Sequence, residues 1–460
     1  MAQPTNQSDE QTVFSTAIKK QAILTFAIRL AGAGLLYLLQ IFLARLLGEQ
    51  DYGLYALVWV WVIVLSQISC MGFNTAILRF LPQYLLHDKA STAHDFLLTA
   101  RNTALGFASL FAIIGLVGTF AFSSWLEQNH LWPIYLGMAC LPLFALGEIY
   151  EGAALARSHI LTALLPSFIL RPLLVFIFLL AAYLLGLPSN ATTAMQAALL
   201  ATALATTIQV LGANRILKSA LIDSSEQSVN GTSDHQQLFW FQTSGPLVLL
   251  DGFYLITLNA DIILLGLLVG PEPIAIYYAA VKTLALVAYI HFATSLVAAR
   301  PFANLFASKA DMREINALYR KMTHWTLWPS IITALAIIVL APYILRLFGS
   351  NYMQGQSVIT ILTIGLIFQG AVGPVQNVLN MAGQQKLSAK SAFAAMAINI
   401  ALNLLLIPIW GIQGAAIATT IGTITQSIMM LWLANKTLGL YPAFLPHPKA
   451  TPIRTTVQAR

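Results

Sequence analysis

The stretch LVLLDGFYLITLNADIILLGLLVG, residues 247–270, is apolar over a length that would cross a bilayer, yet it contains Asp251 and Asp261. A transmembrane helix needs about 20 mostly apolar residues. Runs of this kind recur along nearly the whole chain, which is 58% hydrophobic and only 9% charged, with a mean hydropathy of +0.75. The composition predicts an all-α integral membrane protein, and residues 1–18 show no cleavage signature, so we expect no removable signal peptide.

Hydropathy predicts twelve transmembrane helices. They lie near 22–46, 54–78, 98–121, 132–154, 161–186, 192–214, 240–269, 274–298, 325–347, 356–380, 390–410 and 414–435. With the N-terminus inside, 19 Lys and Arg residues fall in cytoplasmic segments, and only Arg45 and Arg346 fall outside. Because loops rich in these residues stay cytoplasmic, we expect both termini inside. The net charge of +7 is then explained by the inner loops, without a nucleic-acid partner.

The chain divides into two similar halves. Residues 218–238, rich in Ser, Asn, Asp and Gln, predict a cytoplasmic linker between a six-helix lobe at 1–217 and a second at 239–460 with a cytoplasmic tail. RLLGEQDYGLYAL (45–57) aligns with LLVGPEPIAIYYA (267–279) at an offset of 222 residues. An even number of spans in each repeat gives the lobes the same orientation, as parallel repeats around a central cleft. This arrangement is typical of a secondary transporter.

Two segments carry a family resemblance: LARLLGEQDYGLYAL (43–57) and NADIILLGLLVGPEPIAIYYAA (259–280). They resemble the polysaccharide transport family of the multidrug/oligosaccharidyl-lipid/polysaccharide (MOP) exporter superfamily, and the likeness extends over the chain in span number, lobe division and loop rhythm. The resemblance implies a flippase that moves polyprenyl-diphosphate-linked oligosaccharide across the bacterial inner membrane by alternating access, for cell-surface polysaccharide such as lipopolysaccharide O-antigen. It implies membrane lipids and polysaccharide-assembly proteins as partners, and no cofactor.

The intramembrane carboxylates need partners, because a charge at the bilayer centre costs at least about 2.5–3.5 kcal/mol. The helical rise along the predicted spans places Asp261 and Lys282 each about 12 Å below the outer face, on the two arms of one helical hairpin. We expect them to pair, either as a structural clamp or as a gate. Asp251 lies near the midplane, at the depth of Arg171, and an apolar setting would favour its protonated form. Proton coupling at Asp251 is therefore a hypothesis.

Cationic residues inside the spans predict a site for an anionic headgroup. Superfamily analogy puts Arg29 and Lys282 on the walls of the cleft, where a guanidinium would bind a diphosphate bidentately and an ammonium would act as a point charge. Arg171, followed by Pro172, is a further candidate at mid-membrane depth. Snorkelling to the cytoplasmic interface is the alternative for Arg29. Gly32 and Gly34 beside it would permit a close approach of backbone or ligand.

Glu148 and Glu151 lie three residues apart and therefore on one helix face. They predict either a structural cluster with Arg157 or His159 or a site for a coupling cation, and proton and sodium coupling both stay open. Prolines inside the spans predict kinks or broken helices. These are Pro142, Pro166, Pro172 and Pro374.

Motifs for other classes of protein are absent from the sequence. It contains no GxxxxGK[ST], HExxH or GxSxG and no Cys/His ligand spacing, so we expect no enzyme, no catalytic residue and no metal site. A membrane polysaccharide polymerase would need a large loop outside the membrane, and every predicted outer loop is short. A cation-coupled multidrug antiporter of the same superfamily is the nearer alternative. Three buried cations, Arg29, Arg171 and Lys282, favour an anionic substrate over a cationic drug.

Overall fold

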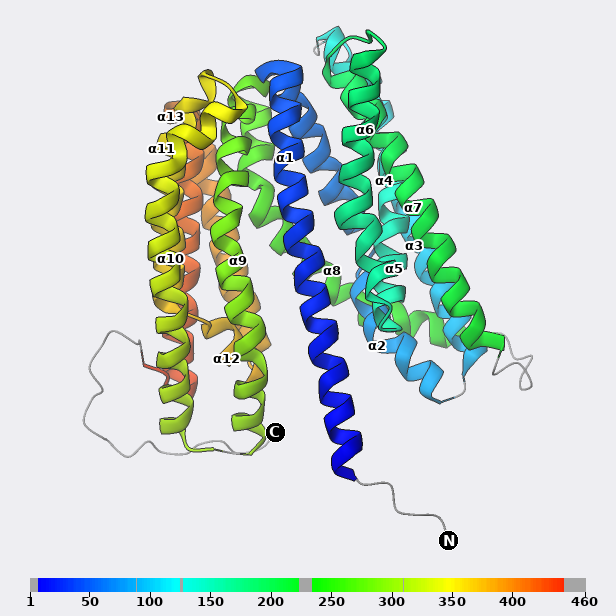
Figure 1. The fold of residues 1–460 in the computed structure, drawn as a ribbon, viewed down its shortest axis with the longest axis vertical. Helices are drawn as coiled ribbons and strands as arrows, with labels where there is room; N and C mark the ends of the chain where they lie inside the picture. The colour runs from blue at the N-terminus through cyan, green and yellow to red at the C-terminus, as the bar shows by residue number, and fades with distance from the viewer. Residues whose placement is uncertain (1–6, 88, 125–126, 223–233, 309, 442–460) are drawn as a thin grey trace. The chain divides into compact units, whose positions relative to one another are not determined.

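The computed structural model describes residues 7–87, 89–124, 127–222, 234–308 and 310–441, and for some helical residues, Asp251 and 286–297 among them, it describes the backbone alone. Every element in these ranges is a helix (Figure 1). The elements are α1 Gln7–Ser69, α2 Phe73–Leu86, α3 Ala90–Ala121, α4 Gln128–Ala156, α5 Ile160–Leu165, η1 Pro166–Leu170, α6 Arg171–Leu184, α7 Ala191–Ile222, α8 Asp234–Leu268, α9 Pro271–Ala307, α10 Met312–Phe348, η2 Asn351–Gln354, α11 Gly355–Val372, α12 Val375–Met381 and α13 Gln385–Leu438.

The protein is a multi-pass integral membrane protein. In the described part of the chain, eight helical segments are long and apolar enough to cross a bilayer. They are Ile23–Ser69, Ala90–Ala121, Gln128–Ala156, Ile160–Leu184, Ala191–Leu217, Met312–Phe348, Asn351–Val372 and Gln385–Leu438. The predicted all-helical membrane class is thereby confirmed, whereas the count of twelve spans in two lobes around a cleft stays a prediction.

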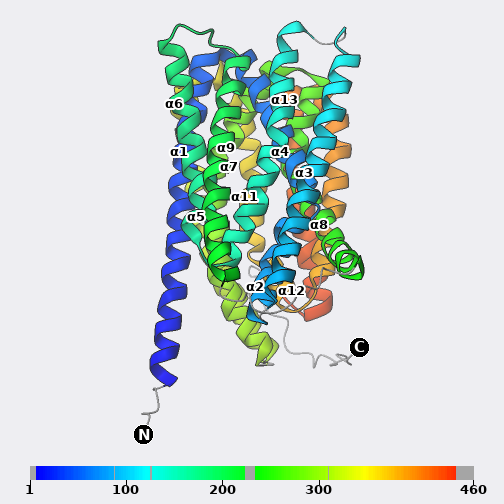
Figure 2. The ribbon, with the colours of Figure 1, turned by 90° about the vertical axis from the view of Figure 1, so that its right-hand side faces the viewer.

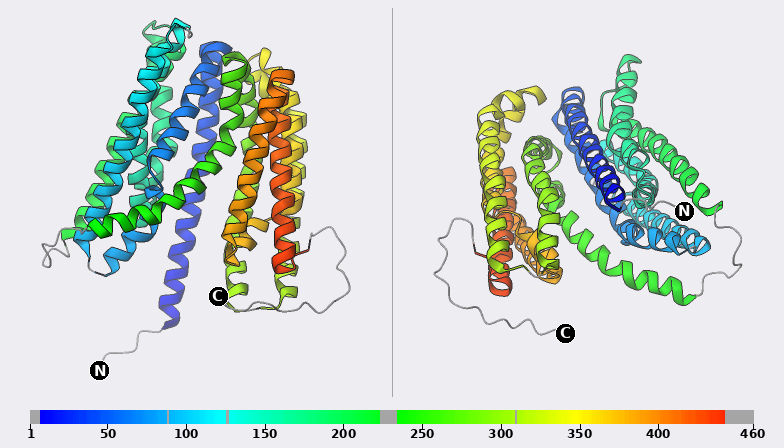
Figure 3. Two further views of the ribbon diagram at one scale, coloured as in Figure 1. Left: turned by 180° about the vertical axis from the view of Figure 1, so that it is seen from behind. Right: turned by 60° about the horizontal axis from the view of Figure 1, so that its bottom comes forward.

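Two of these segments, of 47 and 54 residues, are too long for a single crossing of a hydrocarbon core about 30 Å thick. Each contains one glycine with a non-helical backbone, Gly48 in α1 and Gly411 in α13, both at positive φ. Figure 3 shows the halves of α13, drawn in orange and red, running side by side, and Asn399 Nδ2 of one half donates to Thr419 Oγ1 of the other at 3.2 Å. The chain reverses at Gly411.

The second predicted span, 54–78, differs from the structure in its end. Helix α1 stops at Ser69, and α2 starts afresh at Phe73 after a turn through Met71 (φ 48°) and Gly72 (φ 73°). Gly72 lies against the backbone of α8, because a Cβ atom built on it would come 2.4 Å from the Ser244 oxygen. Close packing and left-handed backbone both require a residue without a side chain there. The apolar run alone gave no sign of this break.

The contacts within the chain form two compact units. Unit 1 comprises 1–279 with 344–355, and unit 2 comprises 280–343 with 356–460. This grouping of contacts assigns 239–279 and 344–355 to the first unit. The predicted lobes at 1–217 and 239–460, with a linker at 218–238 that lies mostly outside the described residues, stay a prediction.

Helix α4 is the central element of unit 1. It packs against α1, α2, α3 and α7, and Figure 2 shows it beside α3, with α5 and α6 next to α1. Two hydrophobic cores lie on it: one includes Cys140, Phe144 and Trp240, and a smaller one joins Ile28, Tyr150 and Ala163. Small residues such as Ala145 and Gly152 on α4 let neighbouring helices approach closely, as is usual in membrane bundles.

The segment 344–355 of unit 1 packs on α1 at its break around Gly48. The Arg45 guanidinium donates two hydrogen bonds to the end of α10, from Nε to the Leu347 carbonyl at 2.7 Å and from Nη2 to the Arg346 carbonyl at 2.5 Å. The rings of Tyr52 and Tyr352 lie 6.3 Å apart. A cation at the last carbonyls of a helix also opposes the negative end of its dipole. Arg45 thus caps a helix about 300 residues away along the chain.

Unit 2 contains most of α9 and α10 together with α11, α12 and α13. Its core joins α9, α10, α11, α12 and α13 through residues such as Phe302, Tyr319, Val378 and Met430. The Tyr319 hydroxyl donates to the Val372 carbonyl at the end of α11. The predicted kink at Pro374 is a complete break, because α11 ends at Val372 and α12 begins at Val375.

Candidate functional site

A short π-helix, η1, lies in the interior of unit 1, where it contacts α1 and α4. η1 joins α5 to α6, and the Arg171 N–H bonds to the Pro166 carbonyl five residues earlier. Pro172 has no N–H, so it cannot donate to the Phe168 carbonyl as a regular α-helix would require. The two prolines therefore enclose a widened turn, where the sequence predicts kinks. Such π-bulges are frequent at functional sites.

Arg171 begins α6 directly after this turn and is 7% exposed. Its guanidinium carbon lies 4.3 Å from the centre of the Phe144 ring, a cation–π contact. It also interacts electrostatically with Glu148 and Glu151 on α4. A Cβ atom built on Gly147 would lie 3.6 Å from Arg171 Nη2, so the absence of a side chain there makes room for the guanidinium.

Arg29, on the first half of α1, faces the same turn. Its guanidinium carbon lies 5.4 Å from the centre of the Phe168 ring, and it interacts electrostatically with Glu151. Gly32, one turn further on, packs on η1: a Cβ atom built there would come 2.7 Å from the Phe168 oxygen. A Cβ atom on Gly34 would meet nothing within 4 Å. The expected close approach of backbone thus holds for Gly32, whereas the space beside Gly34 is open and the approach of a ligand there stays a prediction.

Glu151 connects the two arginines. Its Oε2 accepts a hydrogen bond of 2.7 Å from Ser167 Oγ in η1, and it interacts with Arg171 and Arg29. The sequence suggested Arg157 or His159 as interfacial partners of the two glutamates. In the structure Arg171 is the cation that interacts with both, and the His159 ring instead contacts the Arg157 carbonyl at 2.9 Å. A helix-face argument cannot identify such partners, because they come from other helices.

We call Arg29, Glu148, Glu151, Ser167 and Arg171 the charge cluster. Apolar residues of the smaller core surround it, among them Ile28, Tyr150, Ala163, Leu164 and Val210. Charges in such surroundings interact more strongly than in water, and the cluster combines two guanidinium groups with two carboxyl groups. An anionic ligand that bound the guanidiniums would compete with Glu148 and Glu151 for them.

The remaining predicted charges lie on the α8–α9 hairpin. Asp261 is 4% exposed, and its Oδ2 accepts a hydrogen bond of 2.5 Å from the Tyr277 hydroxyl. Lys282 is half-buried on α9 and belongs to unit 2, whereas Asp261 belongs to unit 1. The Asp261–Lys282 pair therefore stays a prediction. The side chain of Asp251 lies outside the described residues, so its match with Arg171 also stays a prediction.

Sequence reasoning missed several residues of this site. Ser167 lies four residues before Arg171, which puts both on one face of an ordinary helix, and that spacing was a usable signal. Thr206 and Gln209 of α7 also border Gly147, and Gln209 Nε2 donates to the Ala163 carbonyl at 2.9 Å. Their spacing of three in an apolar span marks a polar stripe. Phe144 carries no such signal, because aromatic residues are common throughout the chain.

Known proteins share this architecture. A lipid II flippase, MurJ, in an inward-closed conformation aligns with a TM-score of 0.69 at 15% identity, covering 90% of this chain and 87% of that one. An inward-facing multidrug resistance MATE transporter of the MOP superfamily aligns with a TM-score of 0.68 at 13% identity, covering 90% and 99%. The fold is therefore that of MOP transporters, which is the superfamily that the sequence resembles.

The family follows from sequence. A model of the family described as polysaccharide biosynthesis proteins matches residues 18–301, and a MatE model matches 246–405. The chain belongs to the polysaccharide biosynthesis protein family. An uncharacterized membrane protein of Methanocaldococcus jannaschii is 24% identical over an alignment of 432 positions, which covers 88% of this chain and 82% of the relative. The match at 18–301 includes all five residues of the charge cluster.

Proposed function

We propose that this MOP transporter is a flippase for polyprenyl-diphosphate-linked oligosaccharide, acting in cell-surface polysaccharide assembly. The observation that carries the proposal is the charge cluster, which places Arg29 and Arg171 together inside a chain of the polysaccharide biosynthesis family. Each phosphate of a diphosphate presents a pair of oxygen atoms that a planar guanidinium group can bind bidentately. Lys282, half-buried on α9, is a further candidate for binding phosphate, as the sequence predicts.

The cluster suggests how such a headgroup binds without leaving charges exposed to lipid. Before binding, Glu148 and Glu151 neutralise the guanidiniums. The diphosphate then replaces the carboxylates, and the displaced carboxylates take up a proton or another cation. This exchange couples substrate binding to cation uptake, and both proton and sodium fit it. Lobes that rock around the bound headgroup would complete transport by alternating access.

A second candidate is a cation-coupled multidrug antiporter. The MatE match at 246–405 and the likeness of fold to a multidrug MATE transporter favour it. Under this hypothesis the glutamates would bind the cationic drug or the coupling cation, and the arginines would only position them. The two hypotheses differ in the sign of the substrate's charge, which makes them separable.

We place the protein in the bacterial inner membrane with both termini cytoplasmic. The distribution of Lys and Arg over the predicted loops supports this orientation. Polysaccharide-assembly proteins are the partners that fit the location.

The test uses full-length protein in liposomes that contain a fluorescent polyprenyl-diphosphate oligosaccharide. Flipping is measured for the wild type and for the Arg29→Gln, Arg171→Gln and Lys282→Gln variants, with and without pH or sodium gradients. Arg215→Gln is the matched control, because Arg215 is exposed on α7. We expect at least tenfold slower flipping for the interior variants and no change for the control. The same vesicles report efflux of a cationic dye, and dye efflux without lipid flipping would support the antiporter instead.

A further inference from the structure

A second polar site lies wholly within unit 2, at the break between α11 and α12. The turn there contains Gly373, at φ 71°, and Pro374. Gly373 also packs tightly on α10, because a Cβ atom built on it would come 2.2 Å from Thr323 Oγ1. Irregular backbone next to an apolar span is tolerated where it is buried in protein or lines a water-filled cavity. In transporters such interrupted helices commonly form binding sites.

A cavity of about 90 Å³ opens at this break. One water molecule occupies about 10–15 Å³ by the same measure, so the cavity has room for several waters or one face of a sugar ring. Helices α10, α11, α12 and α13 all contribute to it. The lining includes Gln369, Val372, Gln376, Gln426, Ser427 and Met430.

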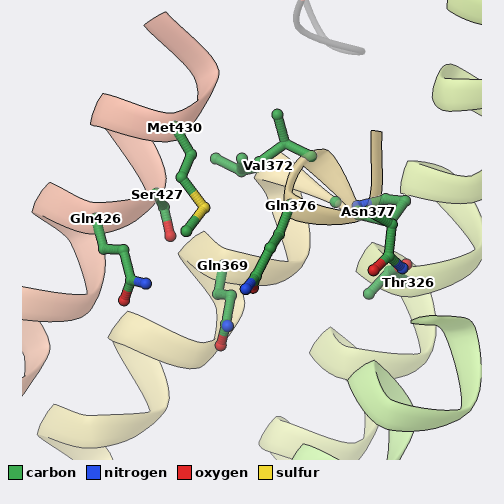
Figure 4. A pocket seen from close by; sticks show the side chains of 11 residues that line it. Thr326, Gln369, Val372, Gln376, Asn377, Gln426, Ser427 and Met430 are labelled. Carbon is green, nitrogen blue, oxygen red and sulfur yellow. The ribbon is translucent and has the colours of Figure 1, made fainter. Parts of the chain in front are cut away.

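The lining, which we call the amide pocket, is polar without being charged. Figure 4 shows Gln369 and Gln376 extending into the space between α11, α12 and α13, with Gln426 reaching toward it from α13. Gln369 and Gln376 are exposed and Gln426 is half-exposed, so their amides are accessible. Ser427 and Thr326 add hydroxyl groups, and Val372 and Met430 add apolar surface. None of the residues that line the described pocket carries a charge.

The chemical groups that line the amide pocket favour some classes of ligand over others. An anion would be expected to meet Arg or Lys, and a cation would be expected to meet carboxylates. Side-chain amides carry both donors and acceptors, which matches sugar hydroxyl groups that donate and accept at once. The apolar patch of Val372 and Met430 suits the C–H face of the same ring.

We propose that the amide pocket binds a neutral sugar unit. The inference rests on the proposed function in one respect only, namely that the sugar belongs to the lipid-linked glycan that the protein transports. The amide pocket of unit 2 then contributes recognition of the glycan, a role that is tested separately from diphosphate binding by the charge cluster. Selectivity for one glycan over another resides in Gln369, Gln376 and Gln426 rather than in the arginines.

The first experiment measures sugar binding directly, so it does not depend on transport. Full-length protein in lipid nanodiscs, prepared free of maltoside detergents whose headgroups would compete, is titrated with methyl glycosides of uncharged hexoses. Saturation-transfer difference NMR reports binding, with inorganic phosphate as the anionic probe. The variants are Gln376→Met and Gln426→Met, and Gln413→Met on the same helix as Gln426 is the matched control, since Gln413 is exposed and bonds to Ser357 outside the pocket.

We expect at least one glycoside to bind wild type and Gln413→Met equally, and about tenfold more weakly to each pocket variant, as loss of a hydrogen bond implies. Thermal unfolding of each variant verifies that it is folded. Gln369→Met is the replacement if one of the two fails to fold. Absence of glycoside binding to the wild type, or equal binding by all variants, would overturn the inference.

The second experiment separates this inference from the proposed function. Flipping is compared for polyprenyl diphosphate with and without its oligosaccharide. We expect the pocket variants to slow flipping of the sugar-bearing lipid alone, whereas Arg29→Gln slows both. If the pocket variants slow both lipids equally, a sugar-specific role is wrong. If glycosides bind as expected and the wild type flips neither lipid, the proposed function fails and the sugar site stands.

Discussion

The Tyr277 hydroxyl donates a hydrogen bond of 2.5 Å to Asp261 Oδ2, and both side chains are buried. The two residues face each other across the α8–α9 turn, 16 positions apart. Asp261 Oδ1 also accepts from the Ile262 N–H. A buried carboxylate that accepts such bonds stays compatible with its apolar surroundings. Tyr277, which aligns with Tyr55 in the internal repeat, therefore stabilises the carboxylate of Asp261 inside an apolar span.

We predict that Tyr277→Phe lowers the free energy of unfolding by about 1.5–3 kcal/mol, the range for a hydrogen bond to a charged group. The ring and its packing are retained, so the loss is that of the hydroxyl. Denaturation in SDS titrations measures it. Tyr183→Phe is the control, because Tyr183 is 58% exposed on α6. Equal stability of the two variants would show that the bond contributes nothing.

A second prediction concerns charge balance around Arg171. Arg171→Gln removes the cation that interacts with both Glu148 and Glu151, and removing one partner of a buried charge pair costs about 3–5 kcal/mol. The double variant Arg171→Gln/Glu148→Gln restores one cation to one carboxylate. We expect the double variant to be more stable than Arg171→Gln alone, as measured by thermal unfolding in detergent. A double variant with the summed loss of both single variants would contradict electrostatic coupling.

The hydrogen bond from Ser167 to Glu151 gives a third prediction. Glu151→Gln keeps an oxygen that accepts from Ser167, whereas Glu151→Leu removes it and leaves a polar group in η1 without its acceptor. We expect Glu151→Leu to be about 1–3 kcal/mol less stable than Glu151→Gln. Ser167→Ala in the Glu151→Leu background should recover part of the difference. Limited proteolysis and thermal unfolding measure both effects.

Two glycines on α1 give a fourth prediction. Gly32→Ala places a methyl group against the Phe168 backbone at 2.7 Å, a distance that forces η1 to move, whereas Gly34→Ala meets open space. We expect Gly32→Ala to lower the thermal midpoint and to slow transport. Gly34→Ala should be neutral or stabilising, by up to about 1 kcal/mol, because alanine is the better helix former. The opposite order of stability would contradict the packing of α1 on η1.

Much of the fold could be predicted because the number of consecutive apolar residues indicates whether a segment crosses the bilayer. The span predicted at 132–154 falls within α4, and that at 192–214 falls within α7. Breaks inside apolar runs were harder: Pro374 marked one, whereas the turn at Met71 and Gly72 follows from packing on α8 that no local pattern encodes.

The candidate site was predicted less completely than the fold. Intramembrane charge alone identified Arg29, Arg171, Glu148 and Glu151 as special, and the structure brings them together. The contacts of Glu151 with Ser167 and of Arg29 with Phe168 depend on the widened turn of η1, which no local sequence pattern specified. The amides of the amide pocket carry no charge and fall inside the predicted spans 356–380 and 414–435, so a search for intramembrane charge did not single them out.

The short segment 344–355 belongs to unit 1 by its contacts, although unit 2 flanks it in the sequence. This segment limits where the chain can be split into two fragments that fold. A fragment encoding 1–279 would lack the carbonyl groups that Arg45 binds and the ring of Tyr352 beside Tyr52. Split or half-length versions of the transporter would therefore need this peptide supplied in trans. The same segment makes the loop around Gly349 a poor choice for inserting tags or epitopes, although its position between two helices would recommend it.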